Sequence, residues 1–69
     1  MSVDAVGVVG AGLIGTSIGL ALGRRGQQAL LVDADPARAA AAAALGAGCA
    51  GSWPDLGGCD HVIVAVPPT

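Results

Sequence analysis

The sequence predicts an α/β fold built on a parallel sheet, and two observations support this prediction. Apolar runs without polar alternation occur at residues 5–9, 29–32 and 61–66, a pattern typical of strands that are buried on both faces. Between them, residues 13–25 and 37–45 place Leu, Ile and Ala at helical spacing. Strands that alternate with helices in this way form parallel sheets.

A glycine turn joins the first predicted strand to the first predicted helix. The apolar run at residues 5–9 ends at Gly10, and the helix is expected to begin at Leu13. Two arginines lie in its last turn, where positive charge interacts favourably with the helix dipole. Gly26 follows them at the position where glycine commonly ends a helix.

The first helix also raises the alternative of a membrane span. Residues 5–23 contain no charged side chain, and Gly15, Gly19 and Gly23 recur at the small-residue spacing of paired membrane helices. Four glycines between residues 7 and 15 instead divide this stretch into a strand and a helix. We therefore expect no membrane segment, and we expect the glycine stripe to let the helix backbone lie close to the sheet.

The next segment contains a second strand and a second helix. Residues 29–32 form the expected strand. Asp35 and Pro36 have the pattern of a helix N-cap followed by proline at the first helical position. The alanine-rich helix at residues 37–45 is expected to end at Gly46.

The last segment is a loop followed by a strand. Residues 47–58 have the composition of a loop, with a short third strand as an option at residues 48–50. Residues 61–66 form the last strand, which the prolines after it end. Right-handed crossovers place the first strand centrally, between the second strand and the last. The last strand then has an open apolar edge, so we expect residues 1–69 alone to be poorly stable.

The glycine turn carries a dinucleotide-binding pattern, G-x-G-x-x-G, over the residues Gly10-Ala11-Gly12-Leu13-Ile14-Gly15. Gly10 permits the tight turn, Gly12 lets the backbone approach a pyrophosphate, and Gly15 lets the helix sit close to the strand. The free amides of Leu13 and Ile14 would face the phosphates at the positive end of the helix. The pattern is specific here because it lies between a predicted strand and a predicted helix.

Asp33 ends the second predicted strand, at about the 20-residue spacing at which an acidic residue holds the ribose of a dinucleotide. A carboxylate there accepts hydrogen bonds from both ribose hydroxyls and repels a 2′-phosphate, so we favour NAD over NADP. Arg38 is placed to reach a 2′-phosphate, although an arginine on a helix is more often solvated. Thr16 and Ser17 either add hydroxyl donors to the phosphate site or form an exposed polar pair.

These features together predict a partial, truncated Rossmann-type doubly wound parallel sheet with the order β-α-β-α-(β)-β. A chain of 69 residues is roughly half the length of a typical domain. We therefore expect residues 1–69 to be the N-terminal part of a nicotinamide-dinucleotide-binding domain, with the rest of that domain and a substrate domain lying outside this sequence.

The remaining chemistry-bearing residues point to no second site. His61 enters the last strand at the end remote from the cofactor crevice, and Trp53 is expected to pack beneath the long loop. Cys49 and Cys59 have neither a CxxC nor a zinc spacing, so we expect reduced thiols and a cytoplasmic protein. The net charge is −2 without a basic patch, which argues against a nucleic-acid partner.

Several segments resemble the prephenate and arogenate dehydrogenases. Residues 6–17 are similar to the family's G-L-G-L-I-G-x-S start, and residues 24–26 to the Arg-Arg-Gly that ends its first helix. Residues 32–36 resemble its V-D-x-D-P motif, and residues 59–69 its D-x-V-I-x-A-V-P-P segment. The chain departs from the pattern between residues 52 and 59, which is shorter than usual, so the helix before the last strand is expected to be reduced to a turn.

The resemblance implies an enzyme that oxidises prephenate, or arogenate, with NAD+ and loss of carbon dioxide. Prephenate would yield 4-hydroxyphenylpyruvate on the way to tyrosine, and the whole enzyme is expected to be a homodimer. The family's catalytic histidine would lie beyond Thr69, so no catalytic residue is assigned. By position, Asp33 would hold the adenosine ribose, Val66 and Pro67 would line the crevice, and the pyrophosphate would lie on Gly10, Ala11, Gly12, Leu13, Ile14 and Gly15.

Two other functions stay open on the sequence alone. The chain has the features expected of another oxidoreductase similar to 6-phosphogluconate dehydrogenase, which shares the fold and the first glycines. A non-catalytic module that senses NAD has the same features.

Overall fold

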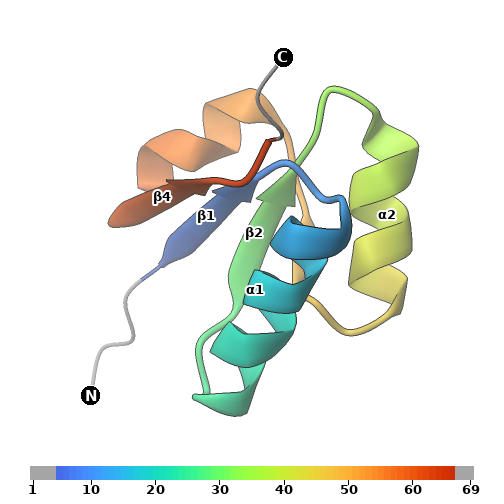
Figure 1. The fold of residues 1–69 in the computed structure, drawn as a ribbon. Helices are drawn as coiled ribbons and strands as arrows, with labels where there is room; N and C mark the ends of the chain where they lie inside the picture. The colour runs from blue at the N-terminus through green and yellow to red at the C-terminus, as the bar shows by residue number, and fades with distance from the viewer. Residues whose placement is uncertain (1–4, 67–69) are drawn as a thin grey trace.

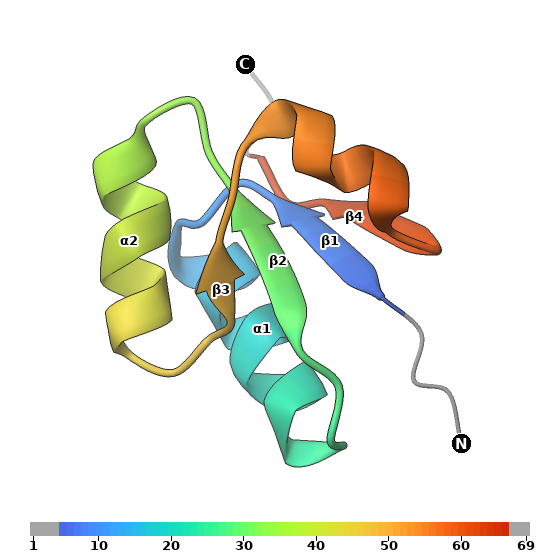
Figure 2. The same cartoon turned by 180° about the vertical axis from the view of Figure 1, so that it is seen from behind.

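The computed structural model describes residues 5–66, and these form alternating strands and helices (Figures 1 and 2). In chain order the elements are β1 (Val6–Val9), α1 (Leu13–Arg24), β2 (Ala29–Val32), α2 (Pro36–Ala44), β3 (Cys49–Ala50), the 3₁₀ helix η1 (Trp53–Gly58) and β4 (His61–Val64). The predicted strand and helix segments are confirmed to within a few residues.

The four strands form one parallel sheet in the order β3-β2-β1-β4. β1 therefore lies between β2 and β4, as the crossover rule predicts. Val9 is opposite Val32 on one side and Val64 on the other, so these three strands end level at one edge of the sheet. That shared carboxyl edge is where open α/β sheets bind ligands.

β4 is shorter than the predicted strand at residues 61–66. Its last ladder bond is donated by the Ala65 amide to the Val9 carbonyl, at 2.7 Å. Beyond Val9 the chain turns away at Gly10, so β4 has no partner to extend along. Pro67, which was expected to help end the strand, lies outside the described residues.

Helices cover both faces of the sheet. α1 and α2 lie on one face, and η1, drawn in orange, lies on the other near β1 and β4 (Figures 1 and 2). Val8 and Leu31 are completely buried beneath the first pair of helices. Ala39 and Ala42 of α2 are buried against the same cluster, since small side chains allow the helix to pack closely on the sheet.

Both helices have the end signals that the sequence predicts. The side chain of Asp35 accepts a hydrogen bond from the Ala37 amide at 3.0 Å, which caps α2. α1 ends in a Schellman motif, because the Gln27 amide donates to the Leu22 carbonyl at 3.0 Å. Gly26 makes this turn with a φ of +78°, a conformation that favours glycine.

The glycine stripe of α1 packs differently from the prediction. A Cβ on Gly15 would collide with the Gly10 carbonyl at the end of β1, so this glycine does bring the helix close to the sheet. A Cβ on Gly19 would instead collide with the carbonyl of Ala47, in the loop after α2. Nothing lies within 4 Å of a Cβ on Gly23. The prediction that the glycine stripe brings the helix close to the sheet is therefore correct at Gly15 and wrong at Gly19 and Gly23.

The helices of this chain are short. α1 contains 12 residues, and within residues 5–66 no helix has both the length and the apolar character that a membrane span requires. The glycine-rich stretch at the start of the chain is divided into a strand and a helix, as expected.

Candidate functional site

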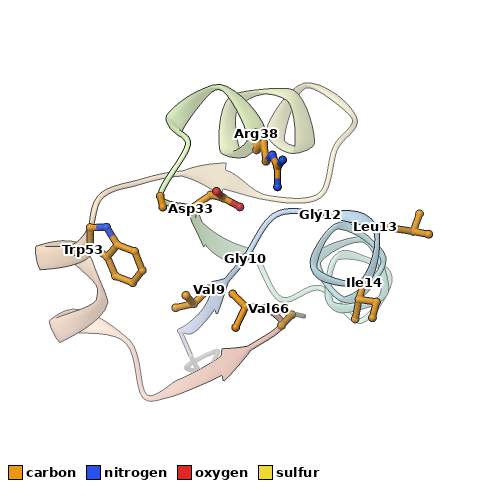
Figure 3. Close-up of a pocket in the computed structure, with 11 residues that line it drawn as sticks. Val9, Gly10, Gly12, Leu13, Ile14, Asp33, Arg38, Trp53 and Val66 are labelled. Carbon is orange, nitrogen blue, oxygen red and sulfur yellow. The ribbon is translucent and has the colours of Figure 1, made fainter. Parts of the chain in front are cut away.

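A cleft of about 440 Å³ lies at the carboxyl edge of the sheet (Figure 3). Its volume falls within the range of small-molecule sites, roughly 300–1,000 Å³. Most of the predicted site residues line it, namely Gly10, Gly12, Leu13, Ile14, Asp33 and Val66. Ala11 and Gly15 belong to the same turn but do not line the cleft, and Pro67 lies outside the described residues.

The glycine turn has a backbone that other residues adopt only with strain. Gly10 has a φ of +99°, and a Cβ there would lie 2.7 Å from the Ala65 carbonyl. Its amide donates to the Val32 carbonyl at 2.8 Å, which ties the turn to the end of β2. At Gly12, by contrast, nothing lies within 4 Å of the position that a Cβ would take. The protein surface at Gly12 is therefore open to a ligand.

The amino end of α1 points at the cleft without a side-chain cap. Gly12 is the N-cap residue and has no side chain to offer, and no acidic residue lies in the first turn. Leu13 and Ile14 are exposed, and the first intrahelical bond is donated by the Thr16 amide to the Gly12 carbonyl. The amides of the first turn are thus available to an anion, which the helix dipole also favours.

Asp33 is held by two backbone amides. Its Oδ2 accepts from the Ala11 amide at 2.8 Å, and its Oδ1 accepts from the Asp35 amide at 2.8 Å. These two bonds lower the pKa of the Asp33 carboxyl, and the positive charge of Arg38 lowers it further. A carboxylate has about four acceptor positions, so the ionised side chain retains acceptors for two more donors.

The hydroxyls near the start of α1 donate to backbone carbonyls. Thr16 Oγ1 donates to the Ala11 carbonyl at 3.2 Å, and Ser17 Oγ donates to the Leu13 carbonyl at 2.8 Å. Neither residue lines the cleft. Of the two alternatives left open by the sequence, the structure supports the polar pair over a phosphate contact, since Ser17 is exposed, Thr16 is half-buried, and both hydroxyls are bonded to the backbone.

Arg38 lies at the mouth of the cleft on α2. Its side chain is exposed, with Nε 3.9 Å from Oδ2 of Asp35. The guanidinium points towards the space between Asp33 and Gly12 (Figure 3). The position is compatible with both roles considered from the sequence, a solvated side chain and a partner for a phosphate.

Trp53 was expected to be a packing residue, and this prediction is wrong. Its side chain is 54% exposed and forms part of the cleft wall. It opens η1, where Asp55 Oδ2 accepts from the Ser52 amide at 2.8 Å and from Ser52 Oγ at 2.9 Å. The bonds from Ser52 also lower the pKa of the Asp55 carboxyl.

The local signal for this arrangement is the Ser-x-x-Asp spacing, which resembles a capping box and indicates a helical turn. Because β3 ends at the carboxyl edge of the sheet, a turn that starts soon afterwards stays near that edge. Ala34 and Ala65 also line the cleft and were not assigned from the sequence.

The other chemistry-bearing residues lie away from the cleft. His61 pairs with Val6 at the amino ends of β4 and β1, as the sequence predicts. Cys49 and Cys59 are free thiols. Within the part of the chain that the structure describes, no cluster of His, Cys, Asp and Glu is suited to a metal ion.

Comparison with known proteins gives two matches. The family model described as "NADP oxidoreductase coenzyme F420-dependent" matches residues 5–69. A probable prephenate dehydrogenase, NovF of Streptomyces niveus, is 46% identical over 61 residues, which make up 88% of this chain and 16% of that protein. No solved structure matches the chain.

The chain thus spans about a sixth of the length of the curated relative that it matches. Both matches are to oxidoreductases, one a family whose description names NADP and the other a dehydrogenase. The cleft, with its glycine turn, helix amino end and acidic strand end, has the parts expected of a dinucleotide site in such proteins. The chain therefore belongs to the coenzyme F420-dependent NADP oxidoreductase family, as an NAD(P)-binding oxidoreductase domain similar in sequence to a prephenate dehydrogenase.

Proposed function

We propose that this chain is the cofactor-binding part of an NAD-dependent prephenate dehydrogenase. The observation that carries the proposal is Asp33, which is ionised and fixed at the cleft by the amides of Ala11 and Asp35. The similarity to a probable prephenate dehydrogenase supports the choice of enzyme. Arogenate is the alternative substrate, and we expect the whole enzyme to be a homodimer.

In this proposal the pyrophosphate lies at the amino end of α1. Gly12 offers a surface without a side chain, so the phosphates approach the backbone closely. The amides of Leu13 and Ile14 donate to the phosphate oxygens, with support from the helix dipole. Ala11 and Gly15 act indirectly, since they fix the turn against Asp33 and against the end of β1.

The adenosine ribose lies on Asp33. The two acceptor positions that remain on the carboxylate suit the 2′- and 3′-hydroxyls. A 2′-phosphate would bring a second negative charge next to a carboxylate that is ionised throughout the neutral range. This repulsion is our reason for proposing NAD. Val66, and Pro67 after it, would form the apolar side of the crevice.

When bound, the cofactor would supply the nicotinamide ring as hydride acceptor for the oxidative decarboxylation of prephenate. The residues of this chain bind and orient the cofactor for that step. Asp33 and Arg38 are the only ionisable residues that line the cleft within residues 5–66. Both lie on the adenosine side in this proposal, so we assign no catalytic residue here.

The binding site is tested by adding NAD+ to isotope-labelled protein and following the backbone amide resonances. We expect shifts at Ala11, Leu13 and Ile14, and none at His61 and Cys49, which lie away from the cleft. Shifts confined to residues outside the cleft would contradict the site.

The reaction is tested with the enzyme that carries this domain. We expect reduction of NAD+ with prephenate, together with release of carbon dioxide. An enzyme that binds NAD+ but turns over neither prephenate nor arogenate would overturn the substrate and leave the cofactor site standing.

NADP is the second candidate cofactor, and Arg38 is the observation in its favour. The guanidinium lies at the mouth of the same cleft as Asp33 and is suited to pairing with a 2′-phosphate. The description of the matching family also names NADP. The relative affinity of the chain for the two cofactors decides between them.

A further inference from the structure

The cleft has an aromatic wall that the glycine motif does not explain. Trp53 comes from η1, on the face of the sheet opposite α1 and α2 (Figures 1 and 2). A large part of its indole surface is open to solvent and borders the cleft. Exposed apolar surface next to a cleft commonly marks a place where a ligand binds.

The positions along the cleft follow the order of groups in a dinucleotide. Leu13 and Ile14 at the start of α1 lie at one end, Asp33 lies between, and Trp53 lies on the opposite side from α1 (Figure 3). A pyrophosphate is bonded to a ribose, and the ribose to its base. With the pyrophosphate on α1 and the ribose on Asp33, the base extends away from α1 towards Trp53.

We propose that Trp53 is the stacking wall of the subsite that takes the adenine base of the bound dinucleotide. This inference rests on the proposed function, which places the adenosine ribose on Asp33. The planar indole offers a π-face to a purine, and such stacking contributes substantially to the binding of nucleotides. Ala34, directly after Asp33, contributes a small side chain at the same end of the cleft and leaves room for the base.

η1 is held in place by contacts that fix the position of Trp53. Asp55 accepts two hydrogen bonds from Ser52 across the first turn of η1. Leu56 packs over the sheet at Gly7, where an added Cβ would lie 2.5 Å from Leu56 Cδ2. The wall is therefore part of the folded structure before a ligand arrives, which lowers the cost of ordering it on binding.

Trp53 also reports on its own subsite. The chain contains one tryptophan and no tyrosine or phenylalanine, so all intrinsic fluorescence comes from this residue. We expect ADP-ribose and AMP to quench this fluorescence in a saturable way, with excitation where adenine does not absorb. Ribose 5-phosphate, which lacks the base, is expected to leave it unchanged. Equal quenching by AMP and ribose 5-phosphate would overturn the proposal.

Calorimetry with ADP-ribose tests the contribution of Trp53 to affinity. We expect Trp53→Ala to weaken binding about tenfold and Trp53→Phe to retain most of the affinity, since one aromatic wall replaces another. Leu45→Ala is the matched control, because Leu45 is 70% exposed and does not line the cleft. Far-UV circular dichroism verifies that each variant keeps its secondary structure.

The outcomes separate the inference from the function on which it rests. Wild-type protein that circular dichroism shows to be folded, but that binds no ADP-ribose by calorimetry, contradicts the dinucleotide site and the inference together. Binding that leaves Trp53 fluorescence unchanged, and that Trp53→Ala does not weaken, overturns the stacking wall alone. Quenching together with a selective loss of affinity in Trp53→Ala supports both.

Discussion

Asp33 joins the two parts of the candidate site through its two carboxylate oxygens. One oxygen is bonded to the glycine turn at Ala11 and the other to the start of α2 at Asp35. The spacing of the sequence predicted this residue, and it predicted the glycines at the turn. It did not predict the bond to Ala11, because that bond depends on how closely β1 and β2 end beside one another.

Replacing Asp33 by asparagine removes the charge and one acceptor. We expect Asp33→Asn to lower the affinity for NAD+ by about tenfold or more, as for the loss of a hydrogen bond to a charged group. The affinity for NADP+ is expected to fall less or to rise, because the repulsion of the 2′-phosphate is gone. Calorimetry with both cofactors measures the change.

Asp60→Asn is the control for this substitution. Asp60 also accepts a hydrogen bond from a backbone amide, that of Ala5 at 2.8 Å, and it does not line the cleft. If Asp33→Asn and Asp60→Asn change the ratio of NAD+ to NADP+ affinity equally, the role given to Asp33 is wrong.

The ionisation of Asp33 also has a consequence for stability. The amides of Ala11 and Asp35 lower its pKa in the folded protein, so its contribution to stability is present above the unfolded pKa of about 3.9 and is lost as the pH falls through the folded value. We expect a carboxyl titration by NMR to place its midpoint below the ordinary value. A midpoint at or above the ordinary value would show that the two bonds do not form.

At the scale of elements, the predicted strands and helices were found because each has a distinct pattern. The second strand coincides with β2, and the N-cap at Asp35 is confirmed. The family resemblance predicted that the helix before β4 would be reduced to a turn, and η1, a 3₁₀ helix of six residues, lies there. The residue pattern alone did not predict η1, because Pro54 and the glycine pair at its end have the composition of a loop. The position of Trp53 was missed for the same reason, since it follows from the path of η1 beside the carboxyl edge of the sheet.

α1 offers a matched pair of glycine substitutions. We expect Gly19→Ala to destabilise the fold, because the new Cβ would collide with the Ala47 carbonyl. We expect Gly23→Ala to stabilise it by up to about 1 kcal/mol, because the space there is open and alanine has the higher helix propensity. Denaturation by urea measures both changes. Equal tolerance of the two substitutions would contradict the close packing of α1 on the loop after α2.

At the scale of the molecule, the sheet has an apolar edge. Within residues 5–66, β1 is the one strand that pairs with β4, and Val64 is 66% exposed. Such an edge is a template for association. The sequence predicted this arrangement, since it placed the last strand outermost in the sheet. The prediction that residues 1–69 are poorly stable alone follows from the same edge.

A charge on β4 tests this edge. We expect the wild-type chain to associate increasingly with concentration in sedimentation experiments, and Val64→Lys to shift it towards the monomer, because charged side chains block pairing at strand edges. Val64 does not line the cleft, so the affinity for NAD+ serves as a control and is expected to stay unchanged. A wild-type chain that remains monomeric at all concentrations would contradict the prediction.

The central claim is that the cleft binds a dinucleotide with its adenosine ribose on Asp33 and thereby selects NAD. Its most direct test is a calorimetric titration of the enzyme that carries this domain with NAD+ and with NADP+ under the same conditions. We predict that NAD+ binds at least about tenfold more tightly, because the 2′-phosphate faces an ionised carboxylate. Equal affinity, or tighter binding of NADP+ through Arg38, would contradict the claim.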